Sequence, residues 1–98
     1  MTAALPTEEQ ADRVARELAP DVVRIRFRID KDWVEDPAIF FLVVLSDDAS
    51  RSERLGEVAD RAETIIRDRL HLDELGHISY FNFRSASEHA QLEDAPWP

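Results

Sequence analysis

The densest group of potential metal ligands lies at residues 71–77. Two imidazoles and two carboxylates fall within this short segment: His71, Asp73, Glu74 and His77. Imidazole and carboxylate groups can bind zinc, but the known structural zinc sites use recognisable ligand spacings, and this segment matches none of them. A histidine near the end of a helix is also explained by the helix dipole. The four residues are therefore only weak metal candidates, and we predict no metal site.

A second acidic group surrounds a tryptophan at residues 30–36. Its acids are Asp30, Asp32, Glu35 and Asp36. A hard cation could bind there, but the glycine and the terminal glutamate of an EF-hand loop are missing. We therefore expect a solvated loop between two strands. Trp33 lies among these acids, and two interpretations stay open: it packs over the end of the sheet, or it stands out as an anchor for a partner.

Residues for nucleophilic catalysis are present, but the motifs that activate them are not. Serines and histidines occur, yet no nucleophile elbow or glycine-rich oxyanion loop accompanies them. The chain has only two glycines, Gly56 and Gly76, so phosphate-cradling loops are absent, and it has no cysteine. We predict that the protein is not an enzyme, has no catalytic residues and needs no cofactor.

Length and charge narrow the class further. The 98 residues suit a single domain, and 21 acidic against 12 basic side chains give a net charge of −9. Such a field repels phosphate backbones and favours cationic partners. No signal-peptide core or membrane-length apolar run is found in the sequence. We expect a cytoplasmic protein that binds neither nucleic acid nor membranes directly.

Periodicity predicts five elements that position these residues. Thr7 and Gln10 have capping-box spacing and open a helix that Pro20 ends, and Ser50 and Glu53 open a longer one that ends near 71–76. Residues 23–29 alternate as a strand, with Val23, Ile25, Phe27 and Ile29 on its apolar face. Residues 39–45 and 77–84 are two further strands. Residues 1–84 would form the domain, and residues 85–98 an acidic tail that packs on the sheet or on a partner.

The order helix, strand, strand, helix, strand predicts an α+β fold, αββαβ. Its mixed three-stranded sheet would carry both helices on one face, as in a ferredoxin-like, split βαβ arrangement lacking one strand. Both faces of the strand at 39–45 are apolar. The two helices can cover only one face of the sheet, so the other face is left open. The predicted partner-binding residues are those of this face together with both tryptophans of the chain: Arg24, Arg26, Arg28, Trp33, Phe40, Leu42, Val44, Tyr80, Asn82, Arg84 and Trp97.

What covers this open face stays undecided between two alternatives. One is a protein partner or a second copy of the chain, because aromatic and arginine side chains are enriched at interfaces. The other is the chain's own tail, with Leu92 and Trp97 folded back over the strip. A large exposed apolar patch is unusual in a monomer, so one of the two is required.

Two resemblances add to this interpretation. The run Phe40–Leu45 followed by residues 59–63, Ala-Asp-Arg-Ala-Glu, resembles the cytoplasmic domain of cation diffusion facilitators, which implies the same fold and dimerisation. The histidines that this family uses for metal are not found in the matching strands and helix. Segments 33–47 and 80–88 resemble short bacterial proteins that accompany a second small gene, sometimes of toxin–antitoxin type.

The resemblances and the acidic charge together predict a bacterial protein-binding module. It would be an antitoxin, immunity-type or accessory partner of a basic protein encoded nearby. The alternative is a homodimeric sensor that binds a small ligand or a metal ion.

Overall fold

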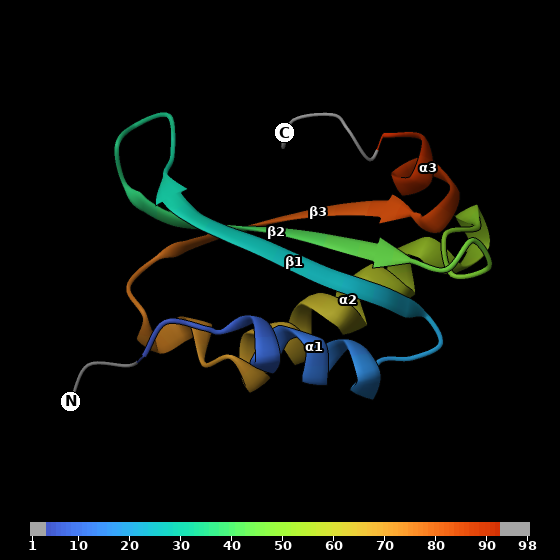
Figure 1. The fold of residues 1–98 in the computed structure, drawn as a ribbon, viewed down its shortest axis with the longest axis horizontal. Coiled ribbons are helices and arrows are strands. Elements are labelled where there is room, and N and C mark those ends of the chain that lie inside the picture. The colour runs from blue at the N-terminus through green and yellow to red at the C-terminus, as the bar shows by residue number, and fades with distance from the viewer. Residues whose placement is uncertain (1–3, 93–98) are drawn as a thin grey trace.

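The computed structural model describes residues 4–92, which form an α+β domain (Figure 1). Its elements are α1 (Glu8–Glu17), β1 (Val22–Lys31), β2 (Pro37–Leu45), α2 (Ser52–Arg69), the 3-10 turn η1 (Leu72–Glu74), β3 (Ile78–Ser85) and α3 (Ala86–Gln91). The strand order is β1-β2-β3, with β1 and β2 antiparallel and β2 and β3 parallel. The predicted αββαβ fold with a mixed three-stranded sheet is confirmed, and α3 is an addition to it.

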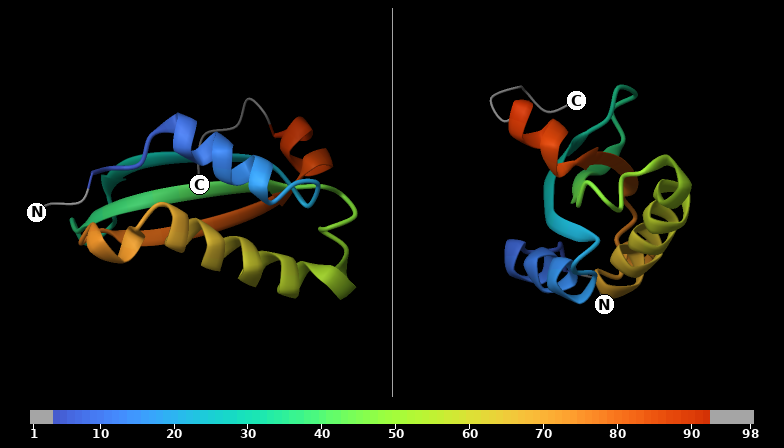
Figure 2. Two further views of the ribbon diagram at one scale, coloured as in Figure 1. Left: turned by 90° about the horizontal axis from the view of Figure 1, so that it is seen from below. Right: turned by 90° about the vertical axis from the view of Figure 1, so that its right-hand side faces the viewer.

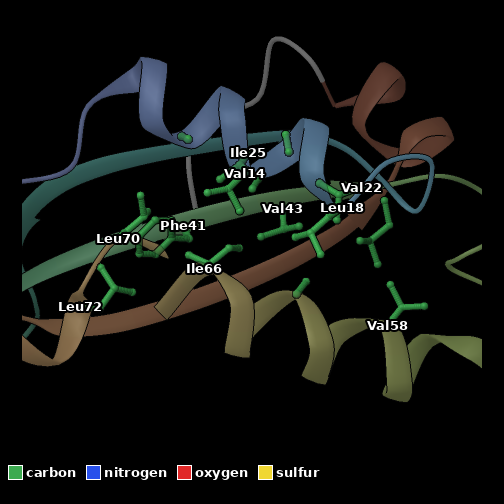
Figure 3. Packing of buried hydrophobic residues seen from close by; sticks show 14 of the residues in the cluster. Val14, Leu18, Val22, Ile25, Phe41, Val43, Val58, Ile66, Leu70 and Leu72 are labelled. Carbon is green, nitrogen blue, oxygen red and sulfur yellow. The ribbon is translucent and has the colours of Figure 1, made fainter. Parts of the chain in front are cut away.

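The sheet has one face covered by helices and one that we call the open face. Figures 1 and 2 show α1 and α2 together on one side of the sheet and α3 on the opposite side. Figure 3 shows the core between the sheet and the two long helices. From β2 the core takes the alternate residues Ile39, Phe41, Val43 and Leu45, of which none is more than 1% exposed.

The two long helices begin in different ways. At α1 the predicted capping box is present: Gln10 N donates to Thr7 Oγ1, and Thr7 N donates to the Gln10 side chain. At α2 the predicted box of Ser50 and Glu53 is wrong. Ser50 Oγ instead donates to the Ser46 carbonyl in the preceding turn, and Arg51 is the N-cap without a side-chain hydrogen bond. The turn after β2 thus delays the start of the helix to Ser52.

The predicted pattern of β1 is wrong at its first residue. The pairing between β1 and β2 is irregular between Val22 and Arg24, so Val22 enters the core at 3% exposure while Val23 is 56% exposed. From Arg24 onward the register is regular: Ile25 is buried and Phe27 is partly buried against the core, as predicted, but Ile29 near the end of the strand is 42% exposed. An irregularity of this kind shifts one residue to the other face without moving the rest.

Residues 86–91 form the short helix α3 where the sequence suggested only a tail. Ser85 caps it, because Glu88 N donates to Ser85 Oγ and Ser85 N donates to the Glu88 side chain. Two further bonds join α3 to the turn after β2: the Ser87 backbone N–H donates to Asp47 Oδ1 at 3.0 Å and Ser87 Oγ to Asp47 Oδ2 at 2.5 Å. The chain therefore turns back onto the open-face side directly after β3.

Candidate partner-binding face

Three rows of side chains cross the open face. The register places Phe40 between Arg28 and Tyr80, Leu42 between Arg26 and Asn82, and Val44 between Arg24 and Arg84. Phe81 and Phe83 pack against the helix-side core, which leaves the intervening β3 residues to the open face. The fold thus brings together on one surface the strand residues that the sequence assigned to a partner-binding site.

The centre of this face is less exposed than the sequence suggested. Leu42 is 3% exposed and Val44 is 2% exposed, so neither forms part of an accessible apolar strip in the isolated chain. At the Val44 end, α3 lies on this side of the sheet and contacts both β2 and β3. In the middle, the side chains of Arg26 and Asn82 flank Leu42 by register. The accessible apolar surface is therefore displaced to the other end of the sheet.

That other end carries three aromatic rings, Trp33, Phe40 and Tyr80, which we call the aromatic end. The Phe40 and Tyr80 rings stack with centroids 5.2 Å apart and an interplanar angle of 14°. Trp33 reaches over from the β1–β2 loop, with its ring centroid 5.2 Å from that of Tyr80 at 49°. Trp33 is nevertheless 77% exposed. Of the two interpretations open for Trp33, the structure supports the projecting side chain and not a buried one.

The loop that presents Trp33 is held by the neighbouring carboxylate of Asp32. Asp32 is only 6% exposed. Its Oδ1 accepts from the backbone N–H groups of Val34 and Asp36, both at 3.0 Å, and its Oδ2 accepts from the Tyr80 hydroxyl at 2.9 Å. One side chain therefore organises the loop and also ties it to β3 across the sheet.

Titration of this pair follows from the same contacts. Desolvation acts to raise the pKa of the Asp32 carboxyl, but the hydrogen bonds from Asp36, Tyr80 and Val34 together lower it. Burial raises the pKa of the Tyr80 hydroxyl, and the carboxylates of Asp32 and Asp36 add to the increase. At neutral pH Asp32 is thus ionised and Tyr80 protonated, which is the state that the hydrogen bond requires.

An open cavity of about 520 Å³ lies at the aromatic end. This volume falls within the range of roughly 300–1,000 Å³ that is usual for small-molecule pockets. The cavity is bordered by Arg28, Lys31, Asp32, Trp33, Phe40, Phe41, Tyr80, Phe81 and Asn82. It joins the aromatic rings of the sheet to the charged groups of the loop.

The two basic groups at this cavity are already in ion pairs. Arg28 Nη1 lies 3.0 Å from Asp30 Oδ2, and its guanidinium carbon lies 4.4 Å from the centroid of Phe40. Lys31 Nζ lies 3.6 Å from Glu35 Oε2. Two acids, Asp32 and Asp36, remain in excess, so the loop adds a negative local field to the acidic surface.

The candidate metal residues do not converge. His71 adopts a left-handed conformation at the end of α2 (φ 52°), and His77 Nδ1 lies 2.9 Å from the carbonyl oxygen of Leu75. Within residues 4–92, no group of three or more histidine or acidic side chains is arranged to hold a metal ion. Asp73 and Glu74 lie in η1, which supplies a turn between α2 and β3.

Trp97, a predicted partner-binding residue, lies outside the described part of the chain. Asp32 was identified only as one of several loop acids, and its structural role was missed. The signal was its place at the first position of the loop, where an aspartate side chain accepts from the N–H two residues on.

Comparisons with protein families, with curated proteins and with solved structures found no match. Among the described residues, no helix has both the length and the apolar character needed to cross a bilayer.

Proposed function

We propose that this protein is a protein-binding module whose contact surface is centred on the aromatic end of the open face. The observation that carries the proposal is the combination of high exposure and fixed position at Trp33. Its side chain is 77% exposed, yet the loop beneath it is held by the Asp32 hydrogen bonds and its ring contacts Tyr80.

Such an arrangement suits binding for an energetic reason. Association orders the side chains at an interface, and a side chain that is already fixed loses less entropy. Tryptophan, tyrosine and arginine dominate the binding energy of protein interfaces. All three types meet here, with Arg28, Phe40 and Tyr80 in one row beside Trp33. We expect this row to contribute more to affinity than Leu42 and Val44, which are buried.

The net charge of −9 supports a basic partner. Complementary charge accelerates encounter and discriminates between partners. The sharper form of the proposal is therefore an antitoxin, immunity-type or accessory protein of bacterial origin that binds a basic protein encoded nearby, in the cytoplasm. Its role would be binding without catalysis.

The test is co-purification with the product of the adjacent gene. We expect Trp33→Ala to reduce the affinity at least tenfold, because truncating a central aromatic anchor typically costs about 2 kcal/mol or more. Leu55→Ala is the matched control: Leu55 is 38% exposed but lies on α2, on the opposite side of the sheet. The affinity of this control should stay within about twofold of the unmodified chain.

Equal affinities for the two variants would contradict the proposed surface. The alternative function, a homodimeric sensor, makes a different prediction. Sedimentation of the chain alone would give a dimer, and Trp33→Ala would convert it to a monomer if the aromatic end were the dimer contact.

A further inference from the structure

The cavity at the aromatic end has a chemistry that selects the side chain it accepts. Its walls include the Trp33 and Tyr80 rings, whose planes meet at 49° with centroids 5.2 Å apart, so they form an open wedge rather than a closed stack. The faces of aromatic rings carry negative potential and attract cations. An aromatic wedge alone would accept apolar and cationic groups alike.

The loop charges separate these two possibilities. Arg28 and Lys31 are paired with Asp30 and Glu35, as described above, and Asp32 is buried and hydrogen-bonded. Asp36 is exposed and follows the buried Asp32 by four residues. Its backbone N–H donates to Asp32 Oδ1 at 3.0 Å, and Asp32 Oδ2 accepts from the Tyr80 hydroxyl at 2.9 Å, so Asp36 lies beside the carboxylate that joins the loop to Tyr80. A cation in the wedge would therefore lie within the field of Asp36.

We propose that the aromatic end binds an arginine side chain of a basic protein partner, with its guanidinium against Trp33 and facing Asp36. This inference rests on the proposed function and specifies the partner residue that the surface recognises. Arginine fits better than lysine, because a planar, weakly hydrated guanidinium stacks on an indole and still donates to a carboxylate. The aliphatic stem of the same side chain would cover the apolar wall beside Phe40.

The site can be probed directly with a capped peptide of alternating glycine and arginine. The control peptide carries citrulline in place of arginine, which keeps the shape and removes the charge. The chain has two tryptophans, so its indole N–H groups give two signals in a nitrogen–proton NMR spectrum, and Trp97→Phe assigns the signal of Trp33. The titration itself uses the unmodified full chain.

We expect the arginine peptide to shift the Trp33 signal and to bind roughly threefold to thirtyfold more tightly than the citrulline peptide, the range for a cation on an aromatic face. Two variants separate local from overall charge. Asp36→Asn should weaken the arginine peptide at least threefold, whereas Asp12→Asn, an equal charge change on the exposed surface of α1, should change it less than twofold.

Three results would overturn the inference: no shift of the Trp33 signal, equal affinity for the two peptides, or equal weakening by the two asparagine variants. None of these would remove the proposed function, which depends on partner affinity in the Trp33→Ala variant. If Trp33→Ala loses the partner while the arginine and citrulline peptides bind with equal affinity, the proposed binding surface is supported. The partner group that it binds is then not a cation.

Discussion

The two faces of β2 are both apolar, but different interactions cover them. On the helix side, Ile39, Phe41, Val43 and Leu45 contact the side chains of α1 and α2 in a continuous core. On the open face, Ala38, Leu42 and Val44 are also buried, but within the described residues they lie outside that core cluster. Their surroundings are arginine and aromatic rows, a short helix and a hydrogen-bonded loop.

This difference separates stability from binding. Burial against two helices removes apolar surface from water over the whole length of the strand, so substitutions there act on the folded state. The open face instead carries polar bonds at its two ends, Asp32 with Tyr80 at one and Asp47 with Ser87 at the other. Substitutions of the exposed side chains there should act mainly on a partner.

The largest effect is expected for Phe41→Ala on the helix side. Phe41 is 1% exposed. Its ring centroid lies 4.9 Å from that of Phe81 and 6.0 Å from that of Phe27. The substitution should lower the free energy of unfolding by about 3–5 kcal/mol in urea denaturation. Phe40→Ala makes the same change one residue away on the open face, where the ring is only partly buried, and should cost roughly 1–2 kcal/mol. Equal costs would show that the two faces do not differ.

The second-largest effect is expected for the pH dependence of stability, through Asp32 in the β1–β2 loop. The pKa of Asp32 is lower in the folded chain than its ordinary value, so its ionised form stabilises the fold. This contribution is complete above the unfolded-state pKa of about 4 and is lost as the pH falls through the lower folded-state value. Asp32→Asn should therefore reduce stability at pH 7 and flatten its decline between about pH 5 and pH 2.

Urea midpoints measured across that pH range test this prediction. Tyr80→Phe removes one of the three hydrogen bonds to Asp32 and should give a decline between those of the unmodified chain and Asp32→Asn. Glu17 and Asp47 also have lowered pKa values, through Arg69 and Ser87, so part of the decline should persist in every variant. An unchanged slope in Asp32→Asn would refute the proposed role of this carboxylate.

A smaller and more local effect is expected at the other end of the open face. Asp47→Ala removes both hydrogen bonds from Ser87, so the backbone amides of α3 should exchange with solvent on the order of tenfold faster. Asp48→Ala is the matched control, because Asp48 pairs with Arg51 and Arg54 and not with α3. Hydrogen exchange followed by mass spectrometry measures the difference. The attachment of α3 through Asp47 is excluded if the two variants exchange alike.

The smallest effect on stability is expected for Trp33→Ala. A side chain that is 77% exposed contributes little to the core, and its loss should change the free energy of unfolding by no more than about 0.5 kcal/mol. The same variant should lose the partner. A loss of stability above about 1 kcal/mol would show that Trp33 stabilises the fold. Stability and binding would then not be divided between the two faces.

Much of the fold could be predicted because it depends on local periodicity. The alternation from Arg24 onward placed three arginines on one face, and the apolar run 39–45 identified a strand with two apolar faces. The capping box at Thr7 fixed the start of α1. Each of these signals involves residues a few positions apart, which share a helix turn or a strand face whatever the rest of the chain does.

The errors have three different physical causes. Ser50 has capping spacing, but its hydroxyl is taken by the Ser46 carbonyl in the turn after β2. Val23 follows the alternation, but pairing with β2 places Val22 in the core instead. The Ser85 and Glu88 pair was a readable signal for α3 that was missed, because the acidic composition of 85–98 suggested a tail.

The sequence by itself determined the order of the elements, the acidic charge and which side chains share each strand face. Only the tertiary structure decided which of those side chains remain accessible. Leu42 and Val44 are buried, whereas Trp33 projects beside a cavity. At the Val44 end α3 returns to the open face, and at the other end Asp32 bonds to Tyr80, 48 residues away in the chain. Exposure depends on contacts between distant segments, and these have no local pattern in the sequence.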